Sequence, residues 1–109
     1  MPSFREFGYR NPRFFANFRF FVQTGPDGQV REAYCYELGE TGLAARVSSP
    51  LMPGSIVTLL LTLPGQRHTL RVCARVIHQE GCDHGFAFIL SGAEQQDYFH
   101  EYFSSLQLP

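Results

Sequence analysis

The sequence predicts an all-β fold: a six-stranded antiparallel β-barrel followed by a C-terminal α-helix. Three observations predict it. Six short segments have the alternating or β-branched character of strands, and glycine or proline bounds each of them. No segment with helical periodicity separates any two of these strands, so parallel strands joined by crossover helices are excluded. The spacing of the apolar residues becomes helical only after residue 90.

The first three strands are expected at 14–23, 30–38 and 42–48. The first of them alternates, and the apolar side chains on one face are Phe14, Ala16, Phe18, Phe20 and Val22. The stretch TGPDGQ at 24–29 is rich in turn residues. It therefore predicts a hairpin between the first two strands.

The last three strands are expected at 55–63, 68–78 and 84–90. A proline–glycine break, SPLMPG, precedes the fourth strand, and the tight turn PGQR follows it. The fifth strand, HTLRVCARVIH, alternates cleanly. Its expected inward side chains are Leu70, Val72, Ala74 and Val76, and its outward ones are Arg71, Cys73 and Arg75.

The segment after the last strand is predicted to form an α-helix at 92–107. A capping box of Ser91 and Glu94 marks its start. Its large apolar side chains fall on one stripe: Tyr98, Phe99, Tyr102, Phe103 and Leu106. We expect this stripe to cover the barrel core. A partner-binding face is the alternative interpretation.

The length of 109 residues fits one domain with a single core. We expect this domain, 1–109, to consist of a flexible arginine-rich arm at 1–13, the barrel at 14–90 and the helix at 92–107. The net charge of −1 argues against a nucleic-acid partner and against binding to a membrane surface.

The basic residues are unusual in kind and in position. All nine are arginine, and four of them lie in the first 19 residues against a single acid, Glu6. The planar guanidinium group suits phosphate and the edge of guanine better than lysine does. A genome that favours arginine codons would give the same composition. The local positive charge suggests one small anionic partner.

Three cysteines indicate the compartment. Cys35 and Cys73 lie in apolar runs and are expected to be buried thiols, while Cys82 lies in a turn. Their odd number without a C-x-x-C pair indicates a reducing compartment. No secretory signal is visible, and no apolar run approaches the length of a membrane span. The sequence therefore predicts a cytoplasmic protein.

Familiar catalytic motifs are absent from the sequence. A phosphate-loop lysine cannot occur in a chain without lysine, and G-x-S-x-G, H-E-x-x-H and G-x-G-x-x-G are missing. His78, Cys82 and His84 gather around one turn, but the paired spacing of structural zinc sites is lacking. We therefore predict no enzyme, no metal and no cofactor, with a metal protein or enzyme centred on this cluster as a minor alternative.

The stretch YELGETGLA at 36–44 has the form of a turn that presents its backbone to a ligand. An acid stands at Glu37, and glycines follow at Gly39 and Gly42. The alternative interpretation is structural: the two glycines would supply only the positive φ of a hairpin turn.

With these features together, the chain resembles a PilZ domain, the bacterial receptor module for cyclic di-GMP. The resemblance covers the arginine-rich arm, the six-stranded barrel and the C-terminal helix. The family carries R-x-x-x-R on the arm and [DN]-x-S-x-x-G between the second and third strands. LMPGSIVTLLLTLPG and GCDHGFAFIL also resemble the family's glycine-containing strands.

Both signature motifs are altered in this chain. In the turn, Glu37 stands at the Asp/Asn position, Gly39 at the Ser position, and Gly42 matches the final glycine. On the arm, Arg13 stands at the second arginine, but Tyr9 occupies the position of the first. Arg10 is adjacent to Tyr9 and is the expected substitute. Arg46, just downstream of the turn, is a second possible substitute.

The resemblance implies a cyclic di-GMP receptor that changes its partner-facing surface on ligand binding. Arg10 and Arg13 would clasp phosphates and guanine edges, and the three turn residues would face a guanine. Tyr9 and Arg46 are secondary candidates, and the effector protein is not identified by the sequence. The alternative is a degenerate PilZ-like domain that binds no nucleotide and acts through protein contacts, as in motility or pilus regulation.

Overall fold

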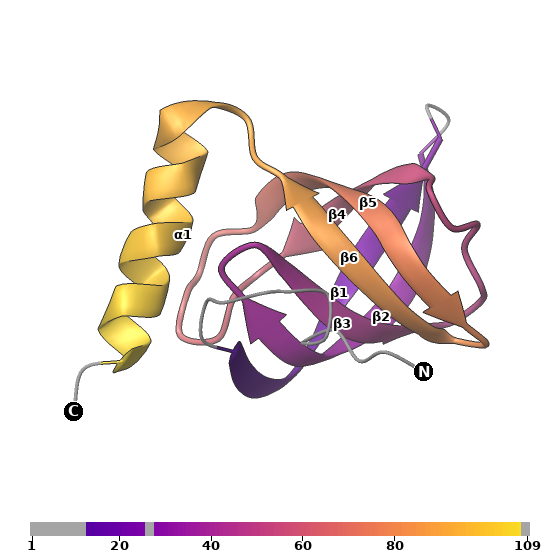
Figure 1. Ribbon diagram of the computed structural model, residues 1–109, viewed down its shortest axis with the longest axis horizontal. Coiled ribbons are helices and arrows are strands. Elements are labelled where there is room, and N and C mark those ends of the chain that lie inside the picture. The colour runs from indigo at the N-terminus through magenta and orange to yellow at the C-terminus, as the bar shows by residue number, and fades with distance from the viewer. Residues whose placement is uncertain (1–12, 26–27, 108–109) are drawn as a thin grey trace.

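The structure, a computed structural model, describes residues 13–25 and 28–107. Six antiparallel strands close into a barrel in the order β1-β2-β3-β6-β5-β4, and one helix follows (Figure 1). The elements are β1 (Arg13–Thr24), β2 (Gln29–Gly39), β3 (Gly42–Val47), β4 (Ile56–Leu61), β5 (Leu70–Glu80), β6 (Asp83–Ile89) and α1 (Gly92–Gln107). The predicted fold class is confirmed.

Alternation along the strands fills the barrel interior. In β5 the side chains of Val72, Ala74 and Val76 are buried, while those between them face outward, as predicted. The largest fully buried side chains come from six elements and one loop: Phe20, Leu38, Leu43, Leu59, Leu61, Leu63, His84, Phe86, Phe99 and Phe103. Each large apolar side chain removed from water stabilises the fold by about 1.5–3 kcal/mol.

The cysteines differ from the prediction at one position. Cys35 is buried, as expected, and burial raises the pKa of its thiol to about 12. Cys73 is exposed, as the alternation of the fifth strand predicted, so the separate expectation of a buried thiol there is wrong. The reason is the alternation of β5, in which Cys73 lies between the inward residues Val72 and Ala74. All three cysteines are free.

Helix α1 lies against one end of the barrel, and its stripe reaches the core (Figure 1). Phe99 packs on Phe88 of β6 with ring centroids 5.0 Å apart, and Phe103 stacks on Phe14 of β1 at 5.6 Å. The stripe is one turn shorter than predicted, because Leu106 is 43% exposed.

The start of α1 differs in one detail from the predicted capping box. The backbone N–H of Ser91 donates to the side-chain oxygen of Gln95 at 3.0 Å rather than to Glu94. Gln95 also donates from its amide to the Arg71 carbonyl of β5, which ties the helix start to the barrel. Among the described residues, no helix is long and apolar enough to cross a membrane.

Candidate functional site

The turn between β2 and β3 forms a glycine corner, residues 39–42. β2 ends at Gly39, Glu40 and Thr41 form the turn, and β3 begins at Gly42. The Thr41 carbonyl accepts the backbone N–H of Phe88 in β6 at 2.9 Å. The corner is therefore held to a second strand besides its own hairpin.

The two glycines of the corner are not there for their conformational freedom. The described glycines with positive φ are Gly25, Gly28, Gly54, Gly65, Gly81 and Gly92. Gly39 and Gly42 are not among them, so the interpretation that they supply positive φ is wrong. Both are buried. What they provide is a pair of positions without a side chain on either side of the turn.

The beginning of β1 lies directly beside this corner. The register of β1 and β2 pairs Arg13 with Gly39, and Phe15 with Glu37. The arginine-rich segment therefore ends opposite the corner, although the two are far apart in the sequence. Phe15 is 84% exposed and lies next to the strand position of Glu37 on the outside of the barrel.

A β-bulge in β2 turns two successive side chains outward. The register with β3 shifts between Cys35 and Glu37, which leaves Tyr36 as an extra residue. An extra residue interrupts the alternation of the side chains by one step. Tyr36 and Glu37 are accordingly both accessible, between the buried Cys35 and Leu38. An aromatic ring and a carboxylate thus stand together on the outer face.

The outward positions of β3 and β6 beside Glu37 carry almost no side chain. Gly42 pairs with Ala87, and Ala44 pairs with Gly85, so four neighbouring positions bear at most a methyl group. Ala44 is buried but is not part of the core cluster. The strands here therefore contribute no large side chain to the outer face, although Gly42, Ala44 and Gly85 are themselves buried.

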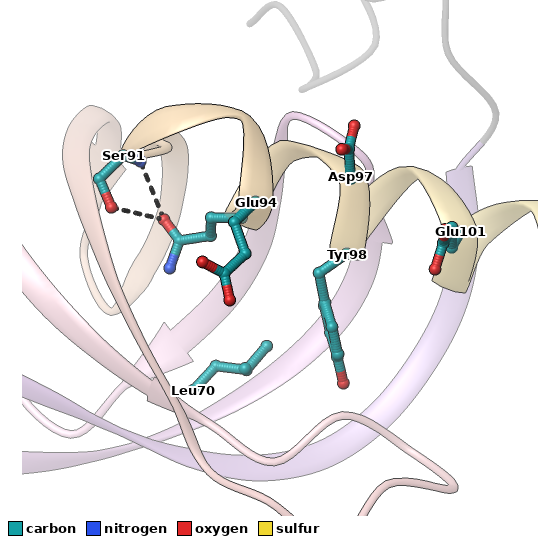
Figure 2. Close-up of a pocket in the computed structure, with 7 residues that line it drawn as sticks. Leu70, Ser91, Glu94, Asp97, Tyr98 and Glu101 are labelled. Atoms are coloured by element: carbon teal, nitrogen blue, oxygen red, sulfur yellow. Dashed lines mark hydrogen bonds between the residues drawn. The ribbon is translucent and has the colours of Figure 1, made fainter.

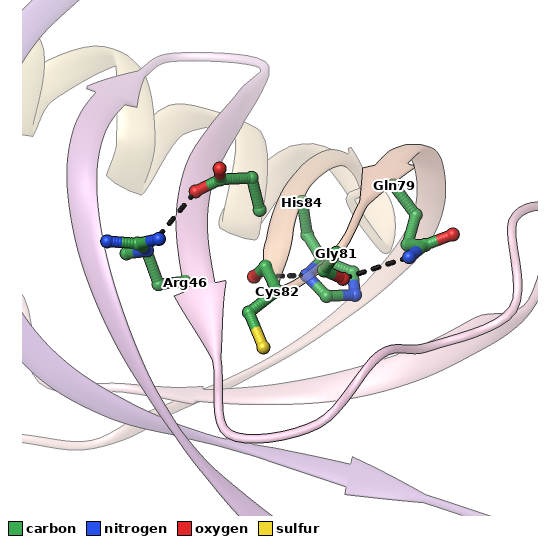
Figure 3. Close-up of polar contacts among 6 residues, drawn as sticks. Arg46, Gln79, Gly81, Cys82 and His84 are labelled. Atoms are coloured by element: carbon green, nitrogen blue, oxygen red, sulfur yellow. Dashed lines mark hydrogen bonds and ion pairs between the residues drawn. The ribbon is translucent and has the colours of Figure 1, made fainter.

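Arg46 closes this face on one side. Its guanidinium contacts the carboxylate of Asp83 at 3.4 Å (Figure 3), and the side chain of Arg46 is largely exposed while that of Asp83 is about half exposed. Burial raises the pKa of the Tyr36 hydroxyl, and the nearby carboxylates of Asp83 and Glu37 raise it further. The phenol therefore stays protonated and uncharged at neutral pH.

The corner also contacts the helix. Glu40 Oε1 lies 3.4 Å from His100 Nδ1 of α1. Glu40 and Thr41 line a small hollow together with Phe88 of β6 and Gln96 of α1. A movement of Glu40 or Thr41 would therefore alter contacts that the corner makes with α1.

His84, one of the three residues considered for zinc, has both ring nitrogens in use. Nδ1 donates to the Cys82 carbonyl at 2.8 Å (Figure 3), and Nε2 accepts the backbone N–H of Leu51 at 2.9 Å. The described residues contain no group of three or more His, Cys, Asp or Glu that could hold a metal ion. The metal alternative centred on His78, Cys82 and His84 is therefore not supported.

A groove runs along the opposite edge of α1 from the corner. Figure 2 shows Glu94 and Tyr98 pointing toward Leu70 of β5, whereas Asp97 points away from it. The residues that line the groove are Leu70, Ser91, Glu94, Gln95, Asp97, Tyr98 and Glu101. Three of them are acids, which gives this edge of the helix a negative charge.

The structure brings together the three predicted turn residues and the backbone of Arg13. Arg46 lies two strand positions beyond Ala44 and is paired with an acid. Tyr9 and Arg10 lie outside the described residues. Sequence reasoning missed Tyr36. A signal was present, because the apolar residues Cys35 and Leu38 are three positions apart, where a regular strand places inward residues two apart.

The comparisons with known proteins agree on one family. The family model described as PilZ domain matches residues 9–104. The PilZ domain of CeSA from a cellulose-synthesizing bacterium has 19% identity and a TM-score of 0.69, covering 89% of this chain and 99% of that one. A comparison with curated proteins gives no match.

Two further solved structures share the fold. The PilZ domain with c-di-GMP of YcgR from Escherichia coli has 17% identity and a TM-score of 0.70, covering 92% of each chain. The inhibitor of motility MotI/DgrA from Bacillus subtilis has 19% identity and a TM-score of 0.66, and this chain covers 51% of its length. Since the family model matches most of its length, the chain belongs to the PilZ domain family.

Proposed function

We propose that the chain is a regulatory receptor for cyclic di-GMP, which binds on the outer face of the barrel at the glycine corner. Membership of the PilZ family supports this, as does the fold shared with the YcgR domain, whose structure contains c-di-GMP. The proposed role is regulatory rather than catalytic. Three free cysteines support a cytoplasmic location.

One observation carries the proposal: the pairing of Arg13 with Gly39. It brings the end of a segment rich in arginine to a surface that is poor in side chains and carries an outward carboxylate at Glu37. Guanidinium groups bind phosphate and the O6/N7 edge of guanine, and a carboxylate accepts hydrogen bonds from its N1 and N2 groups.

Each of these residues would contact a different part of the ligand. Arg10 and Arg13 clasp phosphate and a guanine edge, and Glu37 faces the other edge of a guanine over Gly39 and Gly42. Arg46 would contact the ligand only if its ion pair with Asp83 were broken. That is feasible, because an exposed ion pair stabilises a protein by no more than about 1 kcal/mol.

Binding would be transmitted to an effector protein through α1. Closing of the arm over the corner changes the surroundings of Glu40, which contacts His100 of the helix. The groove on the other edge of α1 is then the surface whose position changes. The effector is not identified.

Arg13→Ala is expected to weaken cyclic di-GMP binding by about five- to 150-fold, because one bidentate arginine–guanine contact contributes about 1–3 kcal/mol. Titration calorimetry measures it. The matched control is Arg71→Ala. Arg71 is exposed on β5, opposite β2 in the barrel, and donates to Gln23 at 3.2 Å. Equal affinities of the Arg13→Ala variant and the wild type would remove Arg13 from the site.

Gly39→Ser is expected to tighten binding about two- to twelve-fold, since a restored hydroxyl adds one hydrogen bond of about 0.5–1.5 kcal/mol. The backbone of Gly39 does not have the positive φ that disfavours serine. Gly42→Ser is the counterpart and is expected to weaken binding by blocking close approach. A shift of both variants in the same direction in calorimetry would contradict the assigned roles.

A second candidate function is protein contact without nucleotide. The absence of a side chain at Gly39 favours it, because the hydroxyl of the family motif is missing there. The groove beside α1 would then be the contact surface. Calorimetry separates the two functions: no heat with wild-type protein at tens of micromolar cyclic di-GMP supports protein contact and rejects the receptor.

A further inference from the structure

We infer that Tyr36 is the stacking surface for one guanine of the ligand, so that ring and carboxylate at successive positions of β2 hold the face and the edge of the same base. The inference rests on the proposed cyclic di-GMP function and names a residue outside the two signature motifs of the family. It is carried by the β-bulge, the exposure of the ring and the neighbouring groups.

The β-bulge is the first step. In a regular strand, Tyr36 and Glu37 would point to opposite sides of the sheet. The register shift at this point makes both accessible. A planar base needs contacts in two directions at right angles, one with its face and one with its edge. Two neighbouring side chains on one surface provide them at a single place.

The state of the ring is the second step. Tyr36 is 43% exposed, and among the described residues no aromatic ring packs against it. Its hydroxyl keeps its proton, because burial and the carboxylates of Asp83 and Glu37 raise its pKa. An uncharged, partly exposed ring stacks on a base without repelling the phosphates.

The chemistry of the edge selects guanine. Guanine presents donors at N1 and N2, which a carboxylate accepts, whereas adenine presents an acceptor at N1, which repels it. Stacking on an aromatic side chain contributes about five- to 150-fold in affinity per base. This is of the size needed to replace the hydroxyl that Gly39 lacks, about two- to twelve-fold.

Titration calorimetry with cyclic di-GMP tests the inference. Tyr36→Ala is expected to bind about five- to 150-fold more weakly than wild type, and Tyr36→Phe within about threefold of it. The matched control is Tyr34→Ala, because Tyr34 is equally exposed on the same strand but farther from the corner. An unchanged Tyr36→Ala, or an equal loss in both alanine variants, overturns the inference while the receptor function stands.

A single tryptophan gives a second readout. The natural chain has none. In Tyr36→Trp, stacking on guanine is expected to quench the indole emission on addition of cyclic di-GMP, while Tyr34→Trp changes little and cyclic di-AMP quenches neither. Binding of cyclic di-GMP by Tyr36→Trp without quenching overturns the stacking role. No binding by the wild-type protein overturns the receptor function and the inference together.

Discussion

Replacing Phe99 with alanine is expected to lower the free energy of unfolding by about 3–5 kcal/mol. The ring is fully buried and packs on Phe88 at the end of the barrel. Helix α1 covers this end of the barrel, and Phe99 belongs to the core cluster that joins the two. A cavity there removes both the transfer energy of the ring and its packing contacts. Since domains of this size are stable by about 5–15 kcal/mol, the loss is a large fraction.

Urea unfolding followed by circular dichroism measures this loss, and the melting temperature is expected to fall by roughly 12–30 °C. Leu106→Ala is the matched control, because Leu106 lies on the same helix and is 43% exposed. Leu106→Ala is expected to lower the free energy of unfolding by less than about 1 kcal/mol. If the two variants lost equal stability, the helix would not be anchored to the barrel through Phe99.

Much of the fold could be predicted, because alternation is a local property of the sequence. β5 shows this best: its apolar residues recur every second position, and those are the buried ones. The prediction failed where a local pattern was outweighed. Cys73 was expected to be buried because it lies in an apolar run, but it faces outward, as the alternation of the strand separately predicted. Leu106 continues the helical stripe past the point where the barrel ends.

The candidate site was predictable only in part, because it depends on pairing between distant segments. The spacing of Glu37, Gly39 and Gly42 suggested a ligand turn, but nothing local shows that Arg13 pairs with Gly39. Tyr36 was missed because its place beside an outward Glu37 on the same face depends on a bulge. The contact of Glu40 with His100 joins residues 60 positions apart and has no signal in the sequence.

His84 was considered as a metal ligand, but in the structure it is a buried residue that hydrogen-bonds to the backbone. It is 1% exposed and packs on Phe86 under the strands that carry the outer face. The Cys82 carbonyl only accepts hydrogen bonds, so Nδ1 carries the proton and Nε2 is the acceptor for Leu51. The ring is therefore neutral. Its pKa is lowered chiefly by burial, with His78 and Arg31 adding to the effect and the Cys82 carbonyl and Asp83 opposing it.

His84→Ala is expected to destabilise the protein by about 2–5 kcal/mol at pH 7.5. The reason is that the buried N–H of Leu51 loses its acceptor and a cavity replaces the ring. The Cys82 carbonyl keeps one partner, since it also accepts the N–H of Val47. Leu51 lies in the loop between β3 and β4, so the loss loosens that connection. Urea unfolding at fixed pH measures the change.

The same residue sets a dependence on pH with a definite sign. Unfolded histidine takes up a proton near pH 6.5, while folded His84 resists it, so the unfolded state binds more protons below that pH. The stabilising effect is complete above about pH 6.5 and is lost as the pH falls from there toward the lower folded pKa. The slope approaches about 1.4 kcal/mol per pH unit. Unfolding between pH 7.5 and 5.5 should show this slope in the wild type and in the exposed control His68→Gln, but not in His84→Gln. Equal slopes in all three proteins would mean that His84 is protonated as readily in the folded chain as in the unfolded one.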